Sequence, residues 1–252
     1  MPSITRRTLL AGAGVSLIST PAGEARAAEN PIPPLRILVT GGHPDDPESG
    51  CGGTIALYAK LGHEVTILYL TRGEAGIKRK THDQAAAIRS EEAAKACAIL
   101  KAKPLFANQI DAAAEVSPAR SADFTRIVQS IDPHVVFTQW PVDSHADHRA
   151  CTSLTLAAWL AMKRSFSLYF YEVSLGEQTQ CYRPTHYVDV TDVEPIKRAA
   201  CEAHASQNSK GFYDTDHITM MKYRGLESGK KLAEAFVHHD GSPPGVLPES
   251  GR

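Results

Sequence analysis

Residues 35–53 read LRILVTGGHPDDPESGCGG. The nearly continuous apolar run at 35–40 stops at Gly41-Gly42, which is typical of a buried strand in a parallel sheet. The glycines lack the G-x-G-x-x-G spacing of dinucleotide-binding turns. His43, Asp45 and Asp46 come directly after them, at the strand's carboxyl end, where open α/β sheets bind ligands. The stretch predicts either a polar ligand site or a simple strand-to-helix turn with an aspartate cap.

Outward from this stretch, short apolar runs alternate with helix-like segments. The expected strands are 35–40, 65–70, 104–108, 135–138, 168–173 and 186–190, and the expected helices are 52–61, 84–100, 118–131, 147–163, 193–206 and 218–236. This alternation predicts an α/β fold, with a twisted, mostly parallel sheet covered by helices on both faces. No repeat or composition shift marks a second domain, so we expect one domain over 28–240 and a mobile tail over 241–252.

The composition excludes several classes of protein. The chain has 252 residues, with 27 Lys and Arg against 28 Asp and Glu, a net charge of −1. This balance gives no reason to expect a nucleic-acid partner. The five cysteines form no C-x-x-C pair, which argues against zinc knuckles and against a dense disulfide framework. One disulfide and the oligomeric state stay open.

The first 27 residues have the layout of an export signal. Arg6-Arg7 precedes a short apolar run, 9–18, and a small-residue site follows at 25–27. This arrangement predicts a twin-arginine signal peptide, read by the twin-arginine export machinery. The run is too short to span a bilayer stably, so we expect no membrane span in the mature protein and a periplasmic or otherwise extracytoplasmic location. The alternative is an amphipathic N-terminal anchor.

A second polar cluster follows the expected strand at 135–138. His145 and His148 are three residues apart, so one helical turn would place both on the same face. Asp147 lies between them and could orient an imidazole through its second nitrogen. Because parallel strands end at the same sheet edge, this cluster should meet the first one. His43, Asp46 and His148 would then form a three-ligand site with an open position, as catalytic zinc requires.

Taken together, the motifs resemble one known family. The His-Pro-Asp-Asp loop at 43–46, the segment TRGEAG at 71–76 and the His-x-Asp-His cluster at 145–148 are similar to those of the PIG-L/LmbE-like family. Weaker matches are 204–207, 224–225 and 233–236, so the resemblance spans about residues 35–236. It implies a Rossmann-like α/β fold and a metal-dependent N-deacetylase, many of which act on N-acetylglucosamine conjugates.

The resemblance also implies roles for single residues. The metal ligands would be His43, Asp46 and His148, holding one Zn²⁺ or another divalent ion per chain. Asp45 matches the general base. His145 matches the residue that stabilises the oxyanion or protonates the leaving amine, and Asp147 matches its partner. Arg72 resembles the arginine that contacts sugar hydroxyls.

The chain departs from the family pattern at two positions. Pro47 stands where a Glu is usual, with Glu48 one place later, and Asp143 stands where some relatives acting on inositol-linked sugars carry Tyr. The expected function is zinc-dependent removal of an acetyl group, by metal-activated water, from an N-acetylated small-molecule or glycoconjugate substrate. The alternatives are a metal-dependent phosphoesterase and a non-catalytic carbohydrate-binding protein of the same fold.

Overall fold

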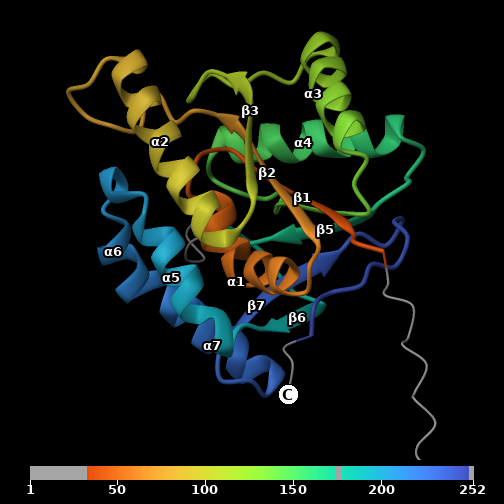
Figure 1. Ribbon diagram of the computed structural model, residues 1–252. Helices are drawn as coiled ribbons and strands as arrows, with labels where there is room; N and C mark the ends of the chain where they lie inside the picture. Colours follow the sequence, from red (N-terminus) through yellow and green to blue (C-terminus); the bar gives the residue numbers. More distant parts are fainter. Residues whose placement is uncertain (1–32, 174–177, 250–252) are drawn as a thin grey trace, which may run out of the picture. The chain divides into compact units, whose positions relative to one another are not determined.

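The fold is taken from a computed structural model, which describes residues 33–173 and 178–249. The expected signal peptide, residues 1–27, lies outside these ranges. From Pro34 onward the chain forms one compact unit, built on the seven-stranded sheet in Figure 1. The strands are β1 (Arg36–Gly41), β2 (Glu64–Thr71), β3 (Lys103–Gln109), β4 (Val135–Gln139), β5 (Ser167–Tyr171), β6 (His186–Asp189) and β7 (Ala233–His238).

The strand order is β3-β2-β1-β4-β5-β7-β6. The first five strands in this order are parallel, whereas β7 pairs antiparallel with both β5 and β6. The chain leaves β1 towards β2 on one side and later returns to β4 on the other. The neighbours β1 and β4 therefore flank the point where the winding direction reverses, which is where open α/β sheets place their ligand crevice.

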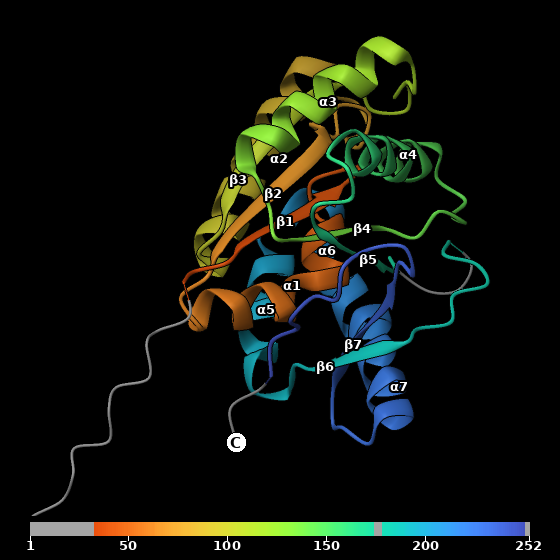
Figure 2. The same cartoon turned by 90° about the vertical axis from the view of Figure 1, so that its right-hand side faces the viewer.

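Helices cover both faces of the sheet, so the expected α/β class is confirmed. The helices are α1 (Asp46–Lys60), α2 (His82–Leu100), α3 (Pro118–Ile131), α4 (Ala146–Ala161), α5 (Glu194–Glu202), α6 (Ser209–Phe212) and α7 (Ile218–Ser228). Because side chains alternate along a strand, Ile37 and Val39 of β1 pack with α1, α2 and α5, whereas Leu38 packs with α3 and α4. Figure 2 shows α3 and α4 lying together on their side of the sheet.

The expected helix over 218–236 is wrong beyond Ser228. Gly229 adopts a left-handed φ of 70° and ends α7, and Ala233–His238 then forms β7. This strand is inserted between β5 and β6, so its conformation depends on partners that are distant in sequence. The expected helix over 193–206 is likewise shorter, because α5 ends at Glu202.

A buried ion pair joins β7 to the first helix. The Lys197 ammonium lies 2.6 Å from the Glu234 carboxylate, and both side chains are almost fully buried. Glu234 also accepts the backbone N–H groups of Gly53 and Thr54 in α1, and Lys197 donates to the carbonyl of Ser49. These bonds satisfy both buried charges and fix the first half of α1, which carries part of the site.

The structure also describes most of the C-terminal tail, the state of the cysteines and the length and polarity of the helices. The part of the tail that the structure describes, 241–249, contacts the domain, since Gly245 and Val246 accept hydrogen bonds from Tyr169 and Tyr58. All five cysteines are free thiols, four of them buried. Across 33–173 and 178–249, every helix is too short or too polar to cross a bilayer.

Candidate active site

The first motif forms a tight loop at the carboxyl end of β1. Gly42 is required there, because a Cβ at this position would lie 2.8 Å from the His148 ring. The backbone N–H of His43 donates to the Asp46 carboxylate at 2.8 Å. Asp45 has a φ of 112°, a conformation that is strained for a residue with a side chain. The loop thus holds two adjacent carboxylates in fixed and different directions.

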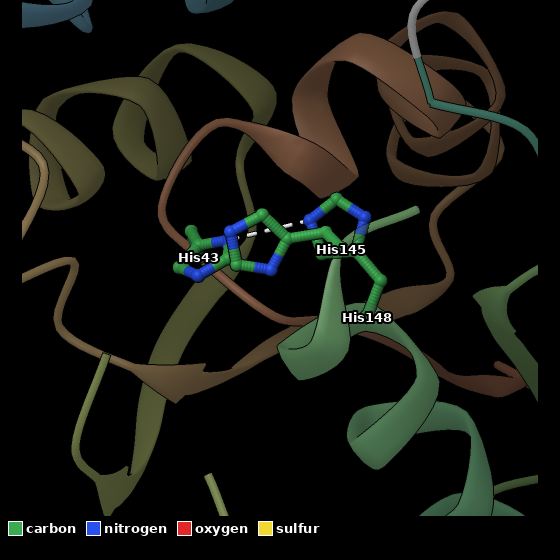
Figure 3. Close-up of side chains that lie close together, drawn as sticks. All are labelled: His43, His145 and His148. Atoms are coloured by element: carbon green, nitrogen blue, oxygen red, sulfur yellow. Dashed lines mark hydrogen bonds between the residues drawn. The ribbon is translucent and has the colours of Figure 1, made fainter. Parts of the chain in front are cut away.

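The second motif lies at the start of α4, beside this loop, and three donor atoms converge between them. His43 Nδ1 and His148 Nε2 are 3.3 Å apart, and Asp46 Oδ2 lies 3.3 Å and 3.2 Å from them. Figure 3 shows the imidazoles of His43, His145 and His148 grouped at this place. A tetrahedral zinc with bonds of about 2.0 Å has ligand atoms roughly 3.3 Å apart. The spacing of the three atoms therefore fits a metal ion.

Each of the two imidazoles has a carboxylate on its other nitrogen. His43 Nε2 lies 3.2 Å from Asp147 and 3.1 Å from Asp111, and His148 Nδ1 lies 3.2 Å from Asp143. Such carboxylates orient metal-bound histidines and increase their basicity. The sequence motifs alone gave no role to Asp111 or Asp143.

The charges of the cluster also suit a cation. Burial opposes the charged form of His43, but hydrogen bonds to three aspartates outweigh it and raise its pKa well above the usual value. For His148, burial likewise acts against the charge, yet Asp46 and Asp143 raise the pKa to about 9. Four carboxylates around two imidazoles leave an excess of negative charge. A divalent ion would neutralise this excess in place of protons.

His145 lies next to the cluster as the N-cap of α4. Its Nδ1 accepts the backbone N–H of Asp147 at 3.2 Å, so a neutral His145 carries its proton on Nε2. Burial and the neighbouring imidazoles lower the pKa of His145 and favour this neutral form. The expected pairing of the Asp147 carboxylate with His145 differs from the structure. That carboxylate bonds His43 and the backbone N–H of Ala112, because the helical turn directs it across the loop.

The partner of the Asp45 carboxylate, by contrast, is Arg89. The Arg89 guanidinium donates to the Asp45 carboxylate at 2.9 Å and also to the carbonyl of Pro44. The Asp45 side chain is 32% exposed, whereas that of Arg89 is 4% exposed. Burial raises the pKa of Asp45, and the Arg89 charge opposes this rise. Asp45 is thus a carboxylate beside the cluster that pairs with an arginine instead of an imidazole. The sequence motifs did not single out this arginine.

The cluster opens into a cavity of about 460 Å³. Its wall includes His43, Asp45, Arg89, Asp111, His145 and His148. Arg72 is not among the lining residues. It is exposed, donates to Asn108 and lies over the Phe106 ring. Gly73, which follows Arg72 directly, has a φ of 69° and turns the chain there. The arginine that lines the cavity is Arg89.

The segment 204–207 contacts α1, α2 and the loop at Gly76, and its Gln207 lines the cavity. His204 is fully buried and lies 3.1 Å from Glu48, Ser206 bonds Glu92 of α2, and Gln207 donates to the carbonyl of Gly76. Glu48 also accepts from the Tyr69 hydroxyl at 2.5 Å and is fully buried. The shift of the glutamate from position 47 to 48 therefore places it in the core, with Tyr69 and His204 as its partners.

Fold and site together define an α/β protein with a candidate one-metal centre at the carboxyl edge of a parallel sheet. The PIG-L family model, described as GlcNAc-PI de-N-acetylase, matches residues 38–159, which include both histidine motifs. The conserved protein TT1542 from Thermus thermophilus is 30% identical, and the match covers 86% of this chain and all of that one, with a TM-score of 0.72. The chain belongs to the PIG-L family of N-deacetylases.

Two further comparisons bear on function. The diacetylchitobiose deacetylase of Thermococcus kodakarensis is 26% identical over 218 residues, which cover 80% of this chain and 82% of that protein. The 4-carboxy-2-hydroxymuconate hydratase GalB of Pseudomonas putida KT2440 is 22% identical and covers 84% of this chain and 99% of its own, with a TM-score of 0.70. The second likeness concerns the fold alone. The fold alone therefore does not determine the reaction, and the site residues do.

Proposed function

We propose that this protein is a zinc-dependent deacetylase that removes the acetyl group from an N-acetylglucosamine-type sugar conjugate. The observation that carries the proposal is the convergence of His43, Asp46 and His148 on one point, with Asp45 beside it and bonded elsewhere. Two imidazoles and one carboxylate are the donor set of catalytic zinc sites. The PIG-L family and the named deacetylase relative support the same reaction.

A divalent ion bound by these three residues would acidify a water molecule and polarise the acetyl carbonyl. Asp45 then acts as the general base, taking one proton from the attacking water. Its raised pKa favours this step, since a carboxylate of ordinary pKa is a weaker base. Asp45 afterwards delivers the proton to the amide nitrogen. The C–N bond breaks, giving a free amine and acetic acid, which retains the second proton of the water and then loses it to solvent as acetate forms.

His145 is placed to stabilise the charge that develops on the carbonyl oxygen. Its Nδ1 is already used as an acceptor, so Nε2–H is the available donor. A neutral imidazole can donate such a bond without being charged beforehand. The Asp147 backbone N–H fixes the ring, and the Asp147 carboxylate holds His43.

Substrate hydroxyl groups are expected to meet Arg89 and Asp111 rather than Arg72. Both line the cavity, whereas Arg72 lies outside its wall. We therefore expect Arg72→Ala to change KM and kcat by less than about twofold. Arg89→Lys, which keeps the charge but loses the planar fork, should lower kcat/KM by about tenfold or more. Steady-state kinetics of both variants on one substrate makes the comparison. A large rise in KM for Arg72→Ala alone would restore Arg72 as the sugar contact.

The reaction class is tested by product analysis. The mature protein, loaded with zinc, is incubated with N-acetylated sugars, and acetate and free amine are measured in parallel. Equal amounts of both, lost on chelation, are the expected result. Phosphate release from phosphoesters without acetate release would favour the phosphoesterase alternative. Saturable sugar binding without any product would favour the carbohydrate-binding alternative.

We also propose that the protein is exported by the twin-arginine machinery, on the basis of Arg6-Arg7 and the apolar run after it. Replacement of both arginines by lysine should leave uncleaved precursor in the cytoplasm. The measurement is N-terminal sequencing and fractionation of the wild-type and variant proteins. Wild-type protein from the extracytoplasmic fraction that begins at Met1 would contradict the proposed cleavage.

A further inference from the structure

One wall of the cavity contains a rare backbone feature. Helix α6 runs directly into a π-helical turn at Tyr213–His217, where the backbone N–H of Ile218 donates to the carbonyl of Tyr213, five residues earlier. The wider path of such a turn brings residues five apart closer to the same face than in an α-helix, where they point about 140° apart. Phe212 and His217 are five apart, and both line the cavity. π-Helical turns occur frequently at functional sites.

The turn is held in place by the residue after Phe212. Tyr213 is fully buried, and its hydroxyl donates to Glu194 at 3.0 Å. The Arg198 guanidinium lies over the Tyr213 ring, 4.3 Å from its centroid. Because this anchor fixes the rotation of the turn, the neighbouring Phe212 is directed outward and stays 50% exposed. The ring is thus presented by a turn that is anchored in the core through Tyr213.

Phe212 is distinct among the residues of the cavity wall. In the part of the chain that the structure describes, it is the one Phe, Tyr or Trp side chain that lines this cavity. The cavity volume of about 460 Å³ falls in the range of clefts for drug-sized ligands, roughly 300–1,000 Å³. It therefore has space for a second ring beside the reacting sugar. A pyranose ring has an apolar face of C–H groups, which suits the face of an aromatic side chain.

We propose that Phe212, presented together with His217 by the π-helical turn, determines substrate specificity by binding a second pyranose ring joined to the reacting sugar. The inference rests on the proposed deacetylase function and adds a preference for disaccharides and longer conjugates over single sugars. Phe212 supplies a stacking surface, and His217 supplies a polar edge next to it. His217 is partly buried, and burial and the charge of Lys197 keep its pKa low, at about 4, so it faces the ligand as a neutral imidazole.

The test compares two substrates across three proteins. The substrates are the methyl glycoside of N-acetylglucosamine and the β-linked disaccharide of N-acetylglucosamine. The proteins are wild type, Phe212→Ala and the control Tyr223→Ala, since Tyr223 is 52% exposed on α7 but does not line the cavity. Phe212→Ala should lower kcat/KM for the disaccharide about tenfold, mainly through KM, with a much smaller effect on the methyl glycoside. Phe212→Trp should restore the preference, and Tyr223→Ala should keep it.

Two outcomes would overturn the specificity role: an equal loss on both substrates in Phe212→Ala, or no loss on either. If wild-type protein releases no acetate from either compound, the proposed deacetylase function fails instead. In that case, calorimetric binding of the disaccharide tests the sugar-binding role of Phe212 independently of catalysis. Weaker binding to Phe212→Ala than to wild type would support it, and equal binding would refute it.

Discussion

Asp45→Asn should retain its metal and its substrate affinity while kcat falls about 10²–10⁴-fold, the usual contribution of a positioned general base. Asn has nearly the shape of Asp and tolerates the left-handed φ of 112° at this position. It can still accept the hydrogen bond from Arg89, but it cannot accept a proton from water. The measurement is kcat beside metal content for the purified variant.

The matched control is the neighbouring residue. Asp46 points at both imidazoles, so Asp46→Asn should lose metal affinity, and excess zinc should partly restore its activity. The two isosteric changes at adjacent positions thus separate proton transfer from metal binding. Loss of metal in Asp45→Asn with retention in Asp46→Asn would reverse the two assignments.

His148→Ala should remove most of the metal and lower activity by about 10³-fold or more. The change leaves two protein ligands, which hold zinc weakly, and removal of even an outer partner of a metal ligand costs about 10–100-fold. Elemental analysis of the purified variant is the measurement. His82→Ala serves as control, since this imidazole is exposed at the start of α2, away from the cavity wall.

A graded variant strengthens this test. Asp143 bonds the far nitrogen of His148, so Asp143→Asn should weaken metal binding about 10–100-fold without abolishing it. A fully loaded His148→Ala protein would show that the metal lies elsewhere. The order of metal affinity expected is wild type, then Asp143→Asn, then His148→Ala.

The fold and the meeting of the two motifs could be predicted because each rests on a local pattern. Buried parallel strands appear as continuous apolar runs, and their carboxyl ends share one edge of the sheet. Polar residues directly after β1 and β4 therefore had to approach one another. Asp111 also follows a parallel strand closely, since β3 ends at Gln109. It was not predicted as a site residue because it is distant in sequence from both histidine motifs.

Other features depend on contacts that a sequence pattern does not specify. β7 is a strand because β5 and β6 flank it, not because of its own composition. The Asp147 carboxylate bonds His43 of the other motif rather than a histidine next to it in sequence, and this depends on the packing of the two loops. Arg89 did leave a signal: it shares a helix face with Ala85, Ala93 and Ala96, all buried, and a charge on such a face needs a partner.

The proposed function requires one metal ion, held by His43, Asp46 and His148, to support deacetylation in this cavity. The most direct test is a titration of metal-free protein with zinc while acetate release from an N-acetylated sugar is followed. Activity should rise from the background and reach its plateau at one zinc per chain. Asp45→Asn should bind the same one equivalent yet release almost no acetate. Full activity without metal, or a plateau at two equivalents, would contradict the account.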